Sequence, residues 1–203
     1  MPITNSTATG IAGTIGSFIA AHNYIAIIVL MALESASLPI PSEVVLPLTG
    51  HYVQTGNLNL YLAILATMIG TTIGITIDYY VALVLEKDVV YKNLKLLRIK
   101  KEDVERFDEW FKRNGPFAIF IARLIPLVRG LISFPAGFAR MDLKKFYLYS
   151  LAGSLIWNVA LIEFGYYALS VNSFDITATL FALLAIALYV IYKVALRKIG
   201  KKG

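Results

Sequence analysis

Residues 115–139 read GPFAIFIARLIPLVRGLISFPAGFA, and this stretch decides how the chain folds. It is as apolar as a membrane span, yet Pro116, Pro126 and Pro135 interrupt it. Proline removes a backbone donor and breaks a helix interior. Broken backbone is tolerated at membrane depth only where protein or a water-filled cavity satisfies it. The stretch therefore predicts a re-entrant hairpin, which enters and leaves the membrane on one side.

An earlier stretch has the same character. Residues 35–56 read SASLPIPSEVVLPLTGHYVQTG, which is apolar and interrupted by prolines. We expect a first re-entrant hairpin here, broken at Pro39 and Pro41, just as the second is broken at Pro126 and Gly137.

The composition indicates a membrane protein. Of the 203 residues, 58% are hydrophobic and 16% are charged, and the mean hydropathy is +0.68. Soluble domains are about 45–50% apolar and about 25% charged. The length fits a single membrane domain over residues 1–203. The absence of cysteine and the presence of two histidines exclude disulfides, thiolate metal sites and multi-histidine metal sites, so no metal or cofactor is predicted.

Several other segments are long and apolar enough to form membrane helices. The predicted spanning helices are 58–85, 146–170 and 174–196. Residues 17–33 predict an N-terminal apolar helix that either spans with its flanks or lies in the interface. Residues 86–113 mix charges with apolar residues at helical spacing, which favours a cytoplasmic amphipathic helix on the membrane; a soluble linker helix is the alternative.

The basic residues set the predicted topology. All 19 Lys and Arg lie at or after Lys87. Cytoplasmic loops are enriched in Lys and Arg, so the 86–113 segment and the basic tail 197–203 are predicted to be cytoplasmic. The protein is therefore expected in the cell membrane as a multi-pass protein with a cytoplasmic C-terminus, and nucleic acid is not an expected partner. The two hairpins then enter from opposite faces, which suggests an inverted repeat with a midplane site.

Three acidic residues lie within apolar sequence: Glu34, Glu43 and Asp78. Charged groups at membrane depth are costly and usually functional, so we expect a proton or ion-pair relay. Two alternatives stay open. Glu43 could cap a half-helix, where a carboxylate is stabilised by free N–H groups. Asp78 could make a structural hydrogen bond.

Arg123 and Arg129 flank the break in the second hairpin. Arginine keeps its charge and binds phosphate with a bidentate fork, and a broken helix end offers free N–H groups. The pair therefore predicts a lipid-phosphate site. Alternatively, these arginines form ion pairs with Glu34 and Glu43 across the hairpins. Both readings are compatible, because a phosphate can replace a carboxylate.

No motif predicts an enzyme. The chain lacks a P-loop, a nucleophile elbow and a zinc-protease helix motif. Gly70 and Gly74 are four residues apart, a spacing that lets helices approach closely, either within the chain or between subunits of a homo-oligomer.

Three motifs resemble the DedA family, also called the VTT-domain family. They are ESASLPIPSEV at 34–44, GTTIGITIDYYV at 70–81 and FIARLIPLVRGLISFPAGFARMD at 120–142, followed by Phe146 and Gly153-x3-Trp157. The second motif departs from the family pattern: Ile75 follows Gly74 where Gly-Asp is common, and Ala82-Leu83 stand where Gly-Arg is common.

The resemblance implies an all-α membrane protein, a helical bundle with two opposed re-entrant hairpins. It further implies transport of lipids between leaflets, with polyprenyl phosphate as the expected substrate and a dependence of transport on the proton-motive force. The residues that the resemblance implies to be essential are Glu34, Glu43, Arg123 and Arg129. A proton-coupled small-ion transporter, a phospholipid scramblase of broad specificity and a membrane scaffold without transport are the alternatives. A membrane enzyme that cleaves phosphate is a weaker one, since no His or Ser is placed as a nucleophile beside the arginines.

Overall fold

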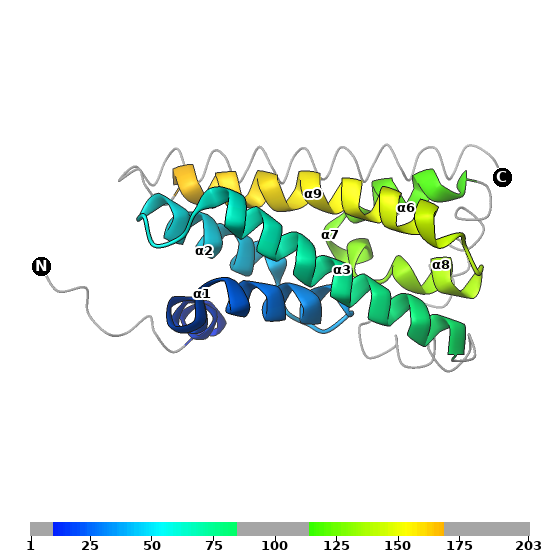
Figure 1. Cartoon of the computed structure of the whole chain (residues 1–203), viewed down its shortest axis with the longest axis horizontal. Coiled ribbons are helices and arrows are strands. Elements are labelled where there is room, and N and C mark those ends of the chain that lie inside the picture. The colour runs from blue at the N-terminus through cyan, green and yellow to red at the C-terminus, as the bar shows by residue number, and fades with distance from the viewer. Residues whose placement is uncertain (1–9, 85–113, 169–203) are drawn as a thin grey trace, which may run out of the picture.

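The computed structural model describes residues 10–84 and 114–168, and all regular structure in this part of the chain is helical. The helices are α1 (Ile11–Ser35), α2 (Ser42–Gln54), α3 (Leu60–Val84), α6 (Pro116–Arg123), α7 (Pro126–Arg129), α8 (Ser133–Phe138) and α9 (Leu143–Ala168) (Figure 1). The predicted segments 86–113, 174–196 and 197–203 lie outside the described residues.

Two long helices, α3 and α9, form the frame of the bundle. They correspond to the predicted spans 58–85 and 146–170, and each is long and apolar enough to cross a membrane. They contact one another and run in opposite directions (Figure 1). At 1.5 Å per residue each extends to about 38 Å, which exceeds the roughly 30 Å hydrocarbon core of a bilayer.

The two faces of α3 differ in the way expected for a helix in lipid. Its buried face carries small and polar residues, whereas large apolar side chains are exposed. Water would disfavour that arrangement, but lipid tails accept it, and small residues let neighbouring helices approach. The exposed side chains are Tyr61, Leu62, Leu65, Ile69, Ile73, Ile77, Tyr80 and Val84.

Helix α1 is bent, which the sequence did not predict. Asn23 has φ 50° and ψ −126°, outside the helical region, so in Figure 1 the first half of α1 is seen end-on and the second half side-on. By length and composition α1 would qualify as a membrane span. Each half, however, reaches only about 18 Å, less than the bilayer core. The predicted 17–33 helix therefore extends to Ile11 and is divided at Asn23.

Both proline-rich stretches form helix–turn–helix units. In the first unit, residues 36–41 make the turn and α2 is the second arm. The first arm is therefore the second half of α1, which the sequence analysis placed in a separate helix. In the second unit, α6 and α8 are the arms, and α7 lies in the turn with Pro126 at its first position. Proline fits there because that N–H has no helical partner.

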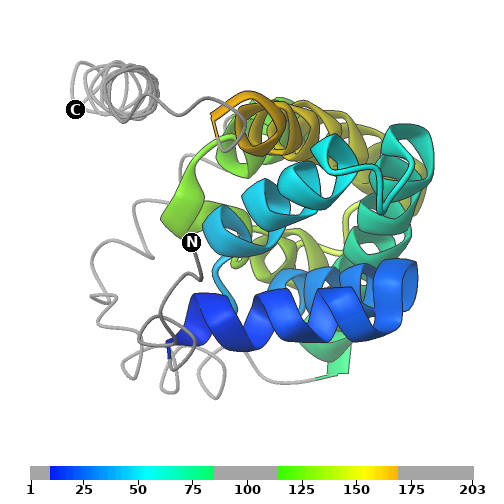
Figure 2. The ribbon, with the colours of Figure 1, turned by 90° about the vertical axis from the view of Figure 1, so that its left-hand side faces the viewer.

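The packing repeats between the two halves. Helix α1 packs on α3, and α6 packs on α9, so each first arm contacts the long helix that follows it. The second arms cross over: α2 packs on α9 and α8 packs on α3 (Figures 1 and 2). Because α3 and α9 are antiparallel, this pattern is what an inverted repeat requires. The orientation of the hairpins relative to a membrane stays a prediction.

Glycines make these contacts close. A side chain at Gly74 would collide with the carbonyl of Ala32 on α1, and one at Gly165 would collide with the carbonyl of Pro47 on α2. Gly70 likewise meets the backbone of α1. The predicted close approach at Gly70 and Gly74 is therefore used within the chain.

We predict that Gly165→Ala destabilises the bundle, because the new methyl group meets a backbone carbonyl that cannot rotate away. Overpacking of this kind costs about 1–3 kcal/mol, and each kcal/mol lowers Tm by roughly 2–4 °C in a chain of this size. Thermal unfolding in detergent measures the effect. Gly10→Ala is the control, since nothing lies within 4 Å of its added carbon. Equal Tm values for the two variants would contradict the packing described above.

Candidate functional site

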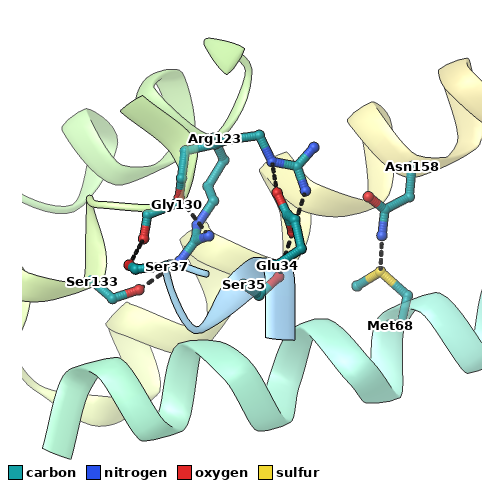
Figure 3. Close-up of polar contacts among 9 residues, drawn as sticks. Glu34, Ser35, Ser37, Met68, Arg123, Gly130, Ser133 and Asn158 are labelled. Carbon is teal, nitrogen blue, oxygen red and sulfur yellow. Dashed lines mark hydrogen bonds and ion pairs between the residues drawn. The ribbon is translucent and has the colours of Figure 1, made fainter. Parts of the chain in front are cut away.

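A buried ion pair joins the two hairpins. Arg129 Nη2 donates to Glu34 Oε2 at 3.2 Å, and Arg129 Nε lies 3.1 Å from Oε1. The Nε contact is an ion-pair contact rather than an aligned hydrogen bond. Glu34 lies in the last turn of α1, and its Oε2 also accepts a hydrogen bond from Ser35 Oγ at 2.9 Å (Figure 3). Both charged side chains are almost fully buried, at 7% and 2% exposure, so each charge compensates the other inside the protein.

Arg123 has a different set of partners. Its Nη1 donates to the backbone carbonyl of Arg129 at 2.6 Å, and its Nη2 donates to Ser133 Oγ at 2.7 Å (Figure 3). The side chain is fully buried. Gly153 on α9 permits this position, because a side chain there would lie 2.8 Å from Arg123 Cβ. Arg123 thus fixes the turn that carries Arg129.

A second polar contact ties both turns to α3. Ser37 Oγ lies 2.5 Å from Asp78 Oδ2 and 2.9 Å from the carbonyl oxygen of Gly130. Ser37 has φ 59°, an uncommon backbone conformation for a residue other than glycine. Asp78 is 3% exposed. The hydrogen bond that the sequence left open for Asp78 is therefore formed, and it involves both hairpins.

Glu43 lies apart from this cluster. It is exposed in the first turn of α2, and the structure shows no direct contact with either arginine. Its charge still acts on Arg129 through space. The predicted pairing of the arginines with two acids is thus realised only between Glu34 and Arg129 in the part of the chain that the structure describes. Glu43 lies in the first turn of α2, where a carboxylate stabilises the helix N-terminus, as the capping alternative for Glu43 expected. The N-cap residue itself is Pro41.

The remaining predicted positions shape the backbone. Pro39 lies in the connection between α1 and α2, Pro41 is the N-cap residue of α2, and Pro126 is the first residue of α7. Gly137 in α8 meets the backbone of Tyr79 on α3.

Four residues of the site were not singled out from the sequence as site residues: Ser35, Ser37, Ser133 and Trp157. Trp157 of α9 lies over Arg129, whose Cζ is 5.2 Å from the ring centroid, a cation–π contact. For the three serines, the available signal was a serine in an apolar stretch that directly follows an acid or stands two residues before a proline. It is weak, because serine at such places also caps helices.

A search for metal sites finds no group of three or more His, Cys, Asp or Glu side chains in residues 10–84 and 114–168. The polar cluster consists of two arginines, two carboxylates and hydroxyl groups. Its positive groups suit an anion such as phosphate.

Comparisons with known proteins agree with the motifs. The family model described as VTT domain matches residues 40–167. The chain belongs to the DedA family of VTT-domain membrane proteins. A Staphylococcus aureus protein named undecaprenyl phosphate transporter A is 35% identical over 155 residues, which cover 74% of this chain and 76% of that protein.

Two further relatives carry different names. A Lactococcus lactis subsp. lactis protein named alkaline phosphatase-like protein is 39% identical, covering 70% of this chain and 69% of its own. Protein DedA of Escherichia coli is 25% identical, covering 56% and 52%. No solved structure matches the chain. Together the family and the transporter names point to a multi-pass membrane transporter rather than an enzyme.

We predict that Glu34→Gln destabilises the protein strongly, because Arg129 then remains charged and buried without its partner. Breaking a buried pair in this way costs about 3–5 kcal/mol. The double variant Glu34→Gln/Arg129→Gln should lose less, since no uncompensated charge remains. Denaturant titration in micelles measures the free energy of unfolding.

Glu43→Gln is the matched control for this experiment, because Glu43 is exposed and surface substitutions usually change stability by less than about 0.5 kcal/mol. If Glu34→Gln were as stable as Glu43→Gln, the buried ion pair would not be part of the native structure.

Proposed function

We propose that this protein moves a phosphate-bearing lipid, most directly a polyprenyl phosphate, between the leaflets of the cell membrane. The observation that carries the proposal is the buried Glu34–Arg129 pair, which joins the two hairpin turns. The names of relatives support the same substrate class, because the S. aureus and Bacillus subtilis proteins are both named undecaprenyl phosphate transporter A.

The ion pair has the properties needed for exchange. A phosphate presents oxygens in the same bidentate way as a carboxylate, so it can take the place of Glu34 on Arg129. Phosphate entering the membrane loses its hydration, and a buried guanidinium compensates for that loss. The isoprenoid tail meanwhile stays in lipid, beside the exposed apolar face of α3.

Protons supply the release step in this scheme. A protonated, neutral Glu34 no longer attracts Arg129, so phosphate can bind Arg129 in its place. When Glu34 loses the proton again, its carboxylate displaces the phosphate. Asp78 is placed for a related role. Ser37 has one hydroxyl hydrogen but two contacts, to Asp78 and to the Gly130 carbonyl, which can only accept. With a charged Asp78 the two acceptors share this one hydrogen, whereas a protonated Asp78 would donate to Ser37 and leave the hydroxyl hydrogen to Gly130.

The predicted topology belongs to the same proposal. The crossed packing of α2 and α8 on opposite long helices supports two hairpins that enter from opposite faces. Rocking of one unit against the other would present the central ion pair to each side in turn. The cytoplasmic placement of the C-terminus and of 86–113 rests on their basic residues.

The test is lipid transfer in proteoliposomes with a short-chain polyprenyl phosphate and a labelled phospholipid side by side. We expect Arg129→Ala to abolish transfer of the polyprenyl phosphate in correctly folded protein, since the arginine is the phosphate ligand. Transfer of both lipids at equal rates would instead indicate a broad scramblase. Transfer of neither, together with a proton-linked ion flux, would indicate a small-ion transporter. Unchanged transfer by folded Arg129→Ala would overturn the proposal.

We further predict that Asp78→Asn folds normally but weakens the response of transfer to a pH gradient, because only the Glu34 carboxyl then takes up a proton. The amide of asparagine can donate to Ser37 as a protonated carboxyl does, so the link to Gly130 is kept at every pH. Transfer rates with and without an imposed gradient give the readout. Ser37→Ala, which removes the link, serves as the comparison. A gradient response equal to that of the wild type in Asp78→Asn would exclude Asp78 as the proton carrier.

A further inference from the structure

The two sides of the Arg129 guanidinium are used unequally. Nε and Nη2 face the carboxylate of Glu34. Nη1 is buried and has no hydrogen-bond partner among the described residues. A buried donor on a charged group is normally satisfied, so this free N–H needs an explanation.

Trp157 presents a second donor of the same kind next to it. The indole ring lies against the Arg129 guanidinium, and the side chain is 4% exposed. Its Nε1 is buried without a hydrogen-bond partner. The indole nitrogen can only donate, and it cannot turn back to a carbonyl of its own helix as a serine can. Two neighbouring side chains, from α7 and α9, thus each carry a buried N–H group without an acceptor among the described residues.

The neighbouring face of α9 continues this polar surface. Ser150, Ser154, Trp157 and Asn158 follow one another at helical spacing, all are buried, and each has a side-chain atom without a partner. Asn158 lies on the α9 side of the ion pair (Figure 3). The serines are near the helix that carries Arg123, because Gly153 between them packs against Arg123 and Phe120.

Such a set matches one ligand chemistry. One cation, an indole N–H and nearby hydroxyls suit a tetrahedral oxyanion, whose several oxygens each accept more than one hydrogen bond. A cation would be repelled by Arg129. An uncharged headgroup would leave the guanidinium without a counter-charge once Glu34 had moved.

We infer that Trp157 is a direct ligand of the substrate phosphate: its indole N–H donates to a phosphate oxygen that Arg129 Nη1 also binds. This rests on the proposed function, and it assigns the two arginines separate roles. Arg129 and Trp157 touch the phosphate. Arg123 is a positioning residue, because both of its terminal nitrogens are committed to the Arg129 carbonyl and to Ser133.

The first test follows the emission of Trp157 itself. The chain contains two tryptophans, so the Trp110→Phe protein, full-length and in detergent, has Trp157 as its single indole. The probes are a short-chain polyprenyl monophosphate, the corresponding alcohol and inorganic phosphate. We expect the emission to change with the lipid phosphate and not with the alcohol. Because Trp157 is retained, this measurement does not depend on how a substitution there folds.

The second test measures affinity by calorimetry. Trp157→Phe keeps an aromatic ring against Arg129 but removes the N–H, and it should weaken binding of the lipid phosphate about ten- to a hundredfold, as expected for losing a hydrogen bond to a charged group. Tyr52→Phe is the matched control, since it removes a donor that bonds the Gly16 carbonyl at 2.9 Å, away from the site.

The outcomes separate this inference from the proposed function. If the lipid phosphate binds, but Trp157→Phe binds it as tightly as Tyr52→Phe and the emission stays unchanged, Trp157 is not a ligand and the transport proposal stands. A change with inorganic phosphate but not with the lipid would keep Trp157 as a phosphate ligand and overturn the lipid assignment. Binding of neither phosphate would overturn both.

Discussion

The buried ion pair between Glu34 and Arg129 is the interaction on which the other features depend. It bridges two turns that are 95 residues apart in sequence, and neither charge is tolerable inside the bundle without the other. The hydrogen bonds around this pair position its two side chains and do not replace the contact between them. Ser35 orients the carboxylate, and Arg123 fixes the carbonyl of Arg129. An ion pair that is necessary but replaceable is what a phosphate carrier needs at its centre.

The architecture explains how two polar turns come to lie inside an apolar bundle. Each hairpin sends one arm to its own long helix and the other arm to the long helix of the opposite unit. Glycines at the contacts remove the side chains that would keep the backbones apart. Both turns are thereby enclosed between α3 and α9, where protein groups satisfy the broken backbone. The same enclosure leaves the large apolar side chains of α3 facing outward.

Much of this fold could be predicted from local sequence. The long apolar runs of α3 and α9 and the breaks at the prolines are local properties, as is the presence of acids and arginines in apolar surroundings. The bend at Asn23, where φ is 50°, was not predicted, because no proline or glycine marks it in the sequence. The different partners of Arg123 and Arg129 could not be predicted from the sequence either. It arises from a backbone carbonyl and from Ser133, partners that only the folded chain brings together.

The most direct measurement of the central claim is the affinity of a short-chain polyprenyl phosphate for the wild type, Glu34→Gln and Glu43→Gln, by calorimetry in detergent. Phosphate competes with the Glu34 carboxylate for Arg129 in the wild type, whereas in Glu34→Gln the arginine has no competing anion. We expect Glu34→Gln to bind the lipid phosphate more tightly than the other two proteins, which should bind it with equal affinity. Weaker or equal binding by folded Glu34→Gln would contradict exchange at this ion pair.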